Sequence, residues 1–153
     1  MAVTNAVIVN DGGAPARILN FLADEAITAG AALEFTSAGK LQLADMAANQ
    51  LSGGIAGFAL TDAADGDMCS MVTGSGIVLN VHVDGGTNNV AVGDNLVIAL
   101  NGAGALSKKA NYADGTDSPP SIAVALEEAT GTAAEHASAS SGGGVQLFKV
   151  LVF

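Results

Sequence analysis

Side chains able to carry catalysis or bind a metal ion are few and scattered in this sequence. The chain has two histidines, His82 and His136, and one cysteine, Cys69. A zinc site needs three or four His, Cys or carboxylate ligands held together, and a reactive thiolate needs a cation nearby. Cys69 falls in a predicted strand without a basic neighbour in the sequence. We therefore predict no zinc site and interpret Cys69 as a small core residue.

The densest group of carboxylates lies in the segment 62–67, Asp-Ala-Ala-Asp-Gly-Asp. It lacks the spacing and the distal glutamate of a calcium-binding EF-hand loop, which favours a solvated turn. The segment 74–76, Gly-Ser-Gly, lacks the outer spacing of a nucleophile elbow, and no phosphate-binding or dinucleotide-binding glycine motif occurs. The sequence thus predicts a non-enzymatic protein with no catalytic residues, no metal site, no cofactor and no small-molecule substrate.

Composition indicates a β-rich fold and restricts the partners. Half of the 153 residues are hydrophobic but only 4% are aromatic, and the 20 glycines suit many tight turns between strands. A net charge of −10 argues against binding to nucleic acid or to anionic lipid. One cysteine cannot form an internal disulfide, and neither a secretion signal nor an apolar run of about 20 residues is present. We expect a protein made in the host cytoplasm, with no membrane partner.

An internal repeat organises the chain. Each copy opens on an apolar residue followed by glycine and then leucine, and glycine-leucine and apolar segments recur downstream at similar distances. The matched segments are 27–33 with 90–96, 39–41 with 104–106, and 55–60 with 122–126, at offsets of 63 to 67. We predict an all-β fold, a small β-barrel or β-sandwich built from two related strand-turn units. One domain would span residues 25–153, with a long Ala, Ser and Gly loop at 129–144.

Strand patterns fall within each copy. Residues 33–35 and 40–43 alternate around a glycine turn, and Asn101-Gly102 follows the apolar run 96–100, so each copy should contain a hairpin. Residues 76–83 read as a central strand. The C-terminal segment 145–153 is apolar on both faces, which places it either at the centre of a barrel or at a subunit interface.

Residues 1–24 have no evident counterpart in the repeat. They contain two apolar runs, at 7–9 and 17–22, separated by a glycine-rich loop. Such a segment could form an extended N-terminal arm that adds a strand to the sheet of a partner. Alternatively, it could cover an edge of the protein's own sheet. The sequence leaves both interpretations open.

Several of these motifs together resemble a known family. The apolar-x-x-Gly-x-x-Leu opening at 27–33, the segment Gly54 to Gly66, the strand near Gly74 and the second opening at 92–96 resemble the small β-barrel capsid decoration (cement) proteins of tailed bacteriophages. Residues 57–66 are the most characteristic part, and the likeness runs from about residue 25 to the C-terminus. The family binds the outer face of expanded capsids, often as trimers, and bridges neighbouring capsomers.

The resemblance implies a decoration protein on the outer surface of a virion, with the major capsid protein as partner and a homotrimer as its expected state. On this hypothesis the N-terminal arm contacts the capsid, and the C-terminal strand forms the core or the trimer interface. An adhesive or fibre-base module on the virion surface is the alternative, with the loop 129–144 as its contact tip. The capsid-contact candidates are Val3, Val7, Ile8, Val9, Arg17, Ile18 and Phe21, and the oligomer-interface candidates are Phe148, Val150 and Val152.

Overall fold

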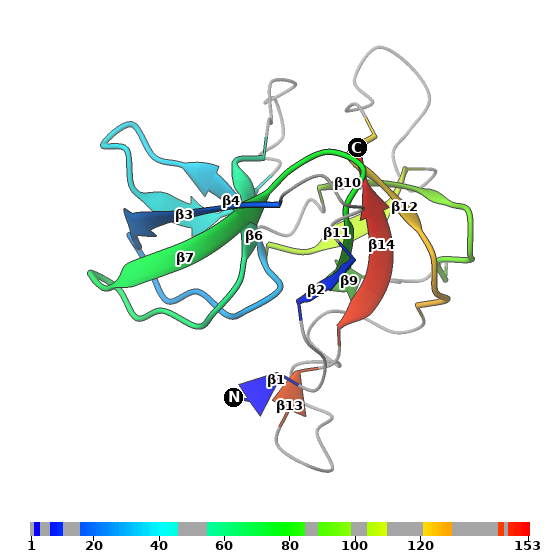
Figure 1. The fold of residues 1–153 in the computed structure, drawn as a ribbon, viewed down its shortest axis with the longest axis horizontal. Helices are drawn as coiled ribbons and strands as arrows, with labels where there is room; N and C mark the ends of the chain where they lie inside the picture. Colours follow the sequence, from blue (N-terminus) through cyan, green and yellow to red (C-terminus); the bar gives the residue numbers. More distant parts are fainter. Residues whose placement is uncertain are drawn as a thin grey trace.

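The described part of the chain folds into strands and turns arranged as two bodies (Figure 1). The computed structural model describes residues 2–3, 7–10, 16–45, 55–84, 89–98, 104–109, 121–129, 144–145 and 147–153. The all-β prediction is confirmed.

One body is a five-stranded sheet with the order β3-β7-β6-β4-β5, in which every neighbouring pair is antiparallel. Its strands are β3 (Arg17–Leu22), β4 (Ala32–Phe35), β5 (Leu41–Leu43), β6 (Gly57–Ala59) and β7 (Met68–Thr73). A parallel bridge between Ala23, just after β3, and Leu41 of β5 joins the two ends of this sheet. The sheet therefore closes into a small barrel, here called the first barrel.

The other body is a seven-stranded sheet with the order β2-β8-β14-β12-β10-β11-β9. Its strands are β2 (Ile8–Asn10), β8 (Val78–Val81), β9 (Val83–Asp84), β10 (Asn95–Ile98), β11 (Leu106–Lys108), β12 (Ala123–Ala125) and β14 (Phe148–Val152). Because β9 continues the path of β8 and pairs in parallel with β11, this sheet also closes, and it is here called the second barrel. A separate two-stranded sheet pairs β1 (Ala2–Val3) with β13 (Gly144–Val145).

The two barrels share one topology, which confirms the predicted repeat as a structural duplication. The order β3-β7-β6-β4-β5 corresponds strand for strand to β8-β14-β12-β10-β11. Matching isolated bridges join Ile27 to Ala63 and Val90 to Ala129. The parallel closures also match, because Ala23 pairs with Leu41 as Val83 pairs with Leu106.

The repeated glycine near the start of each copy has a conformational cause. The amide of Ala31 donates to the carbonyl of Thr28, and the amide of Asp94 donates to that of Ala91, so each copy forms a four-residue turn. The third residue of each turn is a glycine with positive φ, 88° at Gly30 and 91° at Gly93. A type II turn requires this left-handed conformation, which glycine adopts at little cost.

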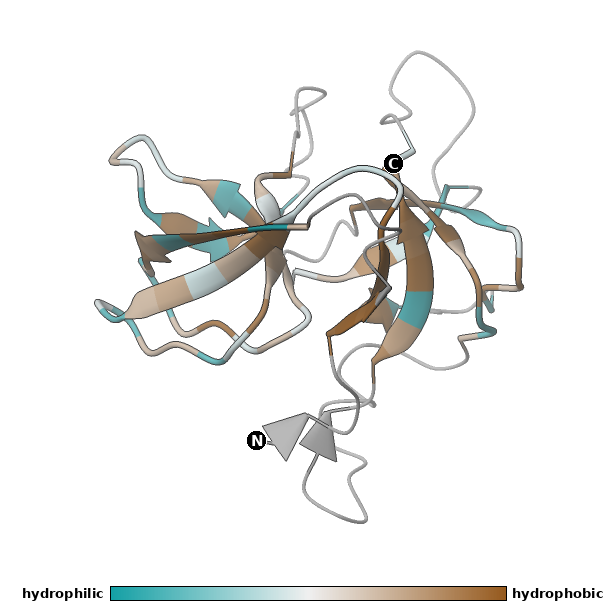
Figure 2. Cartoon of the chain, in the orientation of Figure 1, coloured by the Kyte–Doolittle hydropathy of each residue, from teal (hydrophilic) through white to brown (hydrophobic). Residues whose placement is uncertain are grey.

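Two clusters of buried side chains form the core. The smaller one fills the first barrel and includes Leu33, Leu41 and Met71. The larger one fills the second barrel and extends to Phe58 and Val72 on the outside of the first barrel. The barrels thus pack directly against each other, and Figure 2 shows hydrophobic residues along the strands of both.

Both predicted hairpins are present, as β4 with β5 and β10 with β11. The predicted strand 76–83 forms β8 and β9. The predicted loop falls mostly in 130–143, outside the described residues.

The C-terminal strand is internal, between β8 and β12. Phe148, Val150 and Val152 point into the second barrel, where at most 5% of each residue is exposed. This corrects their assignment as oligomer-interface candidates, because atoms of the same chain already cover them. The opposite face carries the exposed Lys149 and the half-buried Leu151.

The described N-terminal residues follow the second interpretation, in which the segment covers the protein's own sheet, and do not form the extended arm. β2 pairs with β8, and β3 pairs along its whole length with β7, so residues 8–10 and 17–22 belong to the chain's own sheets. The structural counterpart of β3 is β8, which means that the first repeat begins before residue 25. The physical reason is that a barrel of this size needs a first strand to close against its last.

Candidate interaction surface

The outer edge of β3 is the most open main-chain surface among the described strands of the first barrel. From Arg17 to Leu22 this strand pairs with β7 and with no other described strand. The amide of Ala23 donates to the carbonyl of Asp67. In an antiparallel pair every second residue bonds to the neighbouring strand, so this bond shows which amides of β3 point toward β7 and which point away. The amides of Ile18, Asn20 and Leu22 consequently point away from β7, and all three residues are exposed.

The equivalent edge of the second barrel is covered. The amide of Asn80, the counterpart of Asn20, donates to the carbonyl of Val7 at 2.8 Å, beside the pairing of β2 with β8. The amide of His82, the counterpart of Leu22, donates to the carbonyl of Gly30 at 3.0 Å. Among the described residues, the duplicated fold therefore has one edge that is occupied and one that is unpaired.

Exposed apolar side chains gather on the first barrel. Ile18 is 52% exposed and Leu22 45%, and Met68, which pairs with Leu22, is 59% exposed. Between them the hydroxyl of Ser70 donates to Oδ1 of Asn20 at 2.7 Å. At the end of the same barrel the ring of Phe35 meets that of Phe21 edge to face, with centroids 4.8 Å apart. Ile18, Leu22 and Met68 lie on one face of the β3-β7 pair and form an apolar surface, whereas Phe21 lies on the opposite face and packs against the core of the barrel.

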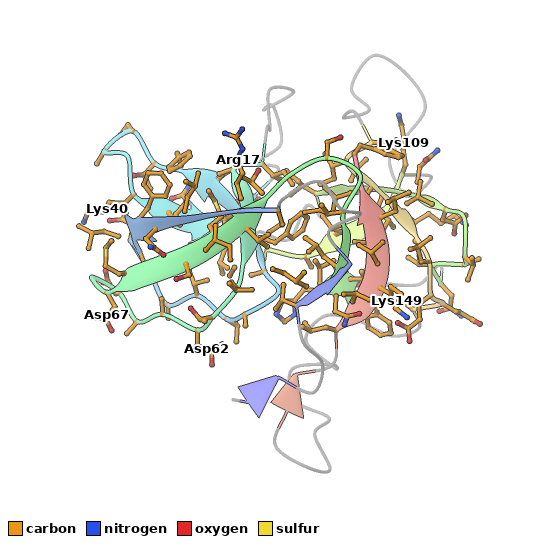
Figure 3. All side chains as sticks on the ribbon, viewed as in Figure 1. Arg17, Lys40, Asp62, Asp67, Lys109 and Lys149 are labelled. Atoms are coloured by element: carbon orange, nitrogen blue, oxygen red, sulfur yellow. The ribbon has the colours of Figure 1, made fainter. Side chains whose placement is uncertain are left out.

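Charged residues lie around this surface. Lys40 and Asp67 lie at the end of the first barrel that is far from the second, whereas Arg17 lies near the junction of the two (Figure 3). Nζ of Lys40 lies 3.0 Å from Oδ1 of Asp24, and this ion pair is largely exposed. Exposed pairs of this kind contribute little to stability.

The predicted capsid-contact residues fall into three groups. Val9, Arg17 and Ile18 are exposed and available to a partner. Ile8 and Phe21 are partly buried, and Val7 is only 5% exposed within the core of the second barrel. Val3 lies in β1, paired with Val145. A partner on the outside of this chain can therefore reach only part of the predicted set, and Val7 is a core residue.

The residues considered for chemistry have structural positions. Cys69 is fully buried in the first barrel, as predicted, and burial raises the pKa of its thiol. His82 is largely buried where the two barrels meet. In the segment 62–67, Oδ1 of Asp62 accepts the amide of Ala29 at 2.8 Å, which ties this acidic turn to the neighbouring turn. No cluster of three or more His, Cys, Asp or Glu residues in the described ranges could hold a metal ion.

The second barrel has its own tied acidic turn. Asp94 accepts the amide of Ala91 at 2.8 Å and forms an ion pair of 2.9 Å with Lys108. The Ala91 hydrogen bond, with help from Lys108, lowers the pKa of the Asp94 carboxyl below its usual value. Both groups stabilise the charged form, so this aspartate supports its turn as a carboxylate.

A shallow pocket lies between the barrels. It is lined by residues of both, including Phe58, Thr73, Ile77 and Val152. Thr73 supplies the one polar side chain of this lining. The pocket therefore offers mainly apolar contact, and its lining contains no ionisable side chain that could activate the Thr73 hydroxyl. Within the described residues, no helix is long and apolar enough to cross a membrane.

The sequence contained a signal for β3 that the repeat comparison missed. Ile18-Leu19-Asn20 matches Val78-Leu79-Asn80 at an offset of 60, three residues shorter than the offset between the two glycine turns. In both copies this segment pairs with the last strand of its barrel, Leu19 with Met71 of β7 and Leu79 with Val150 of β14.

Comparisons with known proteins support the fold. Neither the protein-family models nor the curated proteins include a match to this chain. Among solved structures, the chain is similar to the head fiber gp8.5 N base of bacteriophage phi29, with a TM-score of 0.57 and 17% sequence identity. The likeness covers 91% of this chain and 95% of that one. At this identity the likeness establishes a shared fold that includes both barrels.

Proposed function

We propose that this chain is a virion structural protein that binds the outer surface of a phage capsid and bridges neighbouring capsomers, with the major capsid protein as its partner. The observation that carries the proposal is the shared fold with a phage head fiber base over 91% of this chain. The decoration-protein resemblance of residues 57–66 points to the same class of protein. A net charge of −10 is compatible with an outer surface that does not touch DNA.

The proposed capsid contact uses the exposed members of the predicted set, namely Val9, Arg17 and Ile18. Ile18 and Asn20 present open main-chain groups on the edge of β3, and an extended capsid segment could pair with this edge. Arg17 adds a charge at the start of the strand. A homotrimer would engage several capsid subunits at once, which raises the avidity of individually modest contacts by about 10² to 10⁴.

Point variants test this contact better than removal of residues 2–22, because that deletion would also remove β3 from the first barrel. Expanded capsids made without this protein are mixed with the wild type, with Ile18→Asp, or with Thr61→Asp as a control for added charge at an exposed turn. We expect Ile18→Asp to weaken binding at least about tenfold, as loss of a central contact does. Equal binding of Ile18→Asp and wild type would contradict the proposed contact, and no binding by the wild type would contradict the function.

A fibre-base role is the second candidate, favoured by the description of the similar phi29 protein as a head fiber base. In that role the two barrels would anchor a projecting fibre on the capsid. Imaging of virions carrying this protein separates the two: a compact density that bridges capsomers supports decoration, whereas a fibre that projects from each density supports the fibre base.

A further inference from the structure

The two barrels of one chain meet through different surfaces. The first barrel contributes its glycine turn and the start of β4, residues 29–32, here called a turn face. The second barrel contributes His82, Gly104 and Leu147, here called a strand face. The duplication places a second turn face on the second barrel, at residues 92–95, and a second strand face on the first barrel, at Leu22, Gly39 and Met68.

The contact inside the chain is close. The amide of His82 donates to the carbonyl of Gly30 at 3.0 Å, and the amide of Ala32 donates to that of Gly104 at 2.7 Å. A Cβ atom on Gly30 would lie 2.6 Å from Cδ2 of Leu147, so a larger residue there would force this buried leucine to move. Main-chain hydrogen bonds and side-chain packing therefore both fix the turn face on the strand face.

Each counterpart of this interface is uncovered. Val92 is 66% exposed, whereas its equivalent Ala29 is 1% exposed. Met68 is 59% exposed, whereas its equivalent Leu147 is 1% exposed. A Cβ atom on Gly93 would meet nothing within 4 Å. The chain thus presents one unoccupied turn face and one unoccupied strand face.

The two unoccupied faces lie at opposite ends of the molecule. In Figure 1 the end of β3 and the start of β7 lie at the far left of the first barrel, and the yellow-green segment that leads into β10 lies at the right of the second. Two complementary surfaces that point away from each other cannot meet within one chain. They can meet between chains, as a heterologous contact.

We propose that copies of this chain bind head to tail, with the turn face of the second barrel of one copy on the strand face of the first barrel of the next. The contact repeats the one between the two barrels of a single chain. The carbonyl of Gly93 accepts the amide of Leu22 of the next copy, and Met68 of that copy covers Gly93 as Leu147 covers Gly30. The occupant is a second copy because the same duplication generates both surfaces.

The contact between copies is weaker than the one within a chain. Asp94 and Asn95 stand where the first barrel has Ala31 and Ala32, so the second turn face is more polar. Removing water from such groups offsets part of the gain from apolar burial. Assembly should therefore be seen only at high protein concentration. The proposed contact between copies rests on the duplicated fold and does not depend on the proposed capsid role.

The test uses one variant for each face, measured by sedimentation velocity. Met68→Asp blocks the strand face and leaves the turn face intact, and Val92→Asp does the reverse. Each variant alone should remain monomeric where the wild type forms larger species, with association at least about tenfold weaker. Because each variant keeps one functional face, an equimolar mixture should form dimers and nothing larger.

Ser75→Asp, at an exposed position between the barrels, controls for the added charge and should assemble like the wild type. Circular dichroism on every variant checks that both barrels stay folded, as expected for changes at exposed positions. A wild type that stays monomeric up to its solubility limit would overturn the proposal. So would a mixture of Met68→Asp and Val92→Asp without dimers, or variants that assemble like the wild type. Capsid binding is not measured in this experiment, so its result does not depend on the proposed function.

Discussion

The two barrels share a topology but not an environment. In the second barrel the edge of β8 is covered by β2 and by the turn at Gly30. In the first barrel the same edge, on β3, is open, and apolar side chains around it are exposed. Since the fold of both barrels is the same, the difference cannot arise from the needs of folding alone. The contacts proposed above for Ile18, Leu22 and Met68 rest on this difference.

The largest expected effects on the free energy of unfolding come from substitutions in the two cores. The comparison predicts that the same substitution destabilises the two barrels by different amounts. Leu33 and Leu96 are equivalent residues, and both are fully buried. Leu→Ala in a core costs about 2–5 kcal/mol, depending on how far the surroundings relax. Leu96 belongs to the larger cluster, so Leu96→Ala should fall in the upper half of that range. Leu33 packs in a smaller cluster, beside partly buried Phe21 and Leu43 that can move into the space, and Leu33→Ala should fall in the lower half.

Chemical denaturation of the two variants beside the wild type measures these costs. Two transitions in the wild type would show that the barrels unfold separately, and each cost would then be assigned to its own transition. A larger loss for Leu33→Ala than for Leu96→Ala would break the comparison, because the first barrel would then be the more tightly packed of the two.

The glycine turns give a smaller and sharper contrast. Gly30→Ala and Gly93→Ala both force a left-handed conformation on alanine, which costs about 1 kcal/mol. Gly30→Ala also places a methyl group against Leu147, and such overpacking adds about 1–3 kcal/mol. We therefore expect thermal unfolding of the monomer to show a clearly larger loss of stability for Gly30→Ala. Equal losses of stability for the two variants would mean that Leu147 moves aside at little cost. The packing of Leu147 on Gly30 would then not fix the arrangement of the two barrels.

Sequence patterns predicted the repeat and its hairpins because both depend on local features. A type II turn needs glycine at a fixed place, and a hairpin needs alternating residues around a turn, so Gly30, Gly93 and the strands that follow them stand out. These features carry the duplication even though few side chains match between the copies. The fold class was therefore accessible without structural information.

The environment of each strand was harder to predict from the sequence, because it depends on distant parts of the chain. The segment 148–152 is apolar on both faces by sequence, yet only the structure shows that Phe148, Val150 and Val152 face the core of the second barrel. Similarly, the apolar sequence of residues 17–22 is compatible with a free arm as well as with β3, since an edge strand and an arm have similar compositions. Pairing with residues 68–73, about fifty positions away, distinguishes them.

The most direct measurement of the central claim is hydrogen exchange, resolved by residue, of the edge amides in both barrels. In monomeric Val92→Asp the amides of Asn80 and His82 should exchange slowly, because they are bonded to Val7 and Gly30, whereas those of Asn20 and Leu22 should exchange quickly. In the assembled wild type the Leu22 amide should become protected. Equal protection of the two edges in the monomer would contradict the account, because the first barrel would then have no open edge to offer a partner.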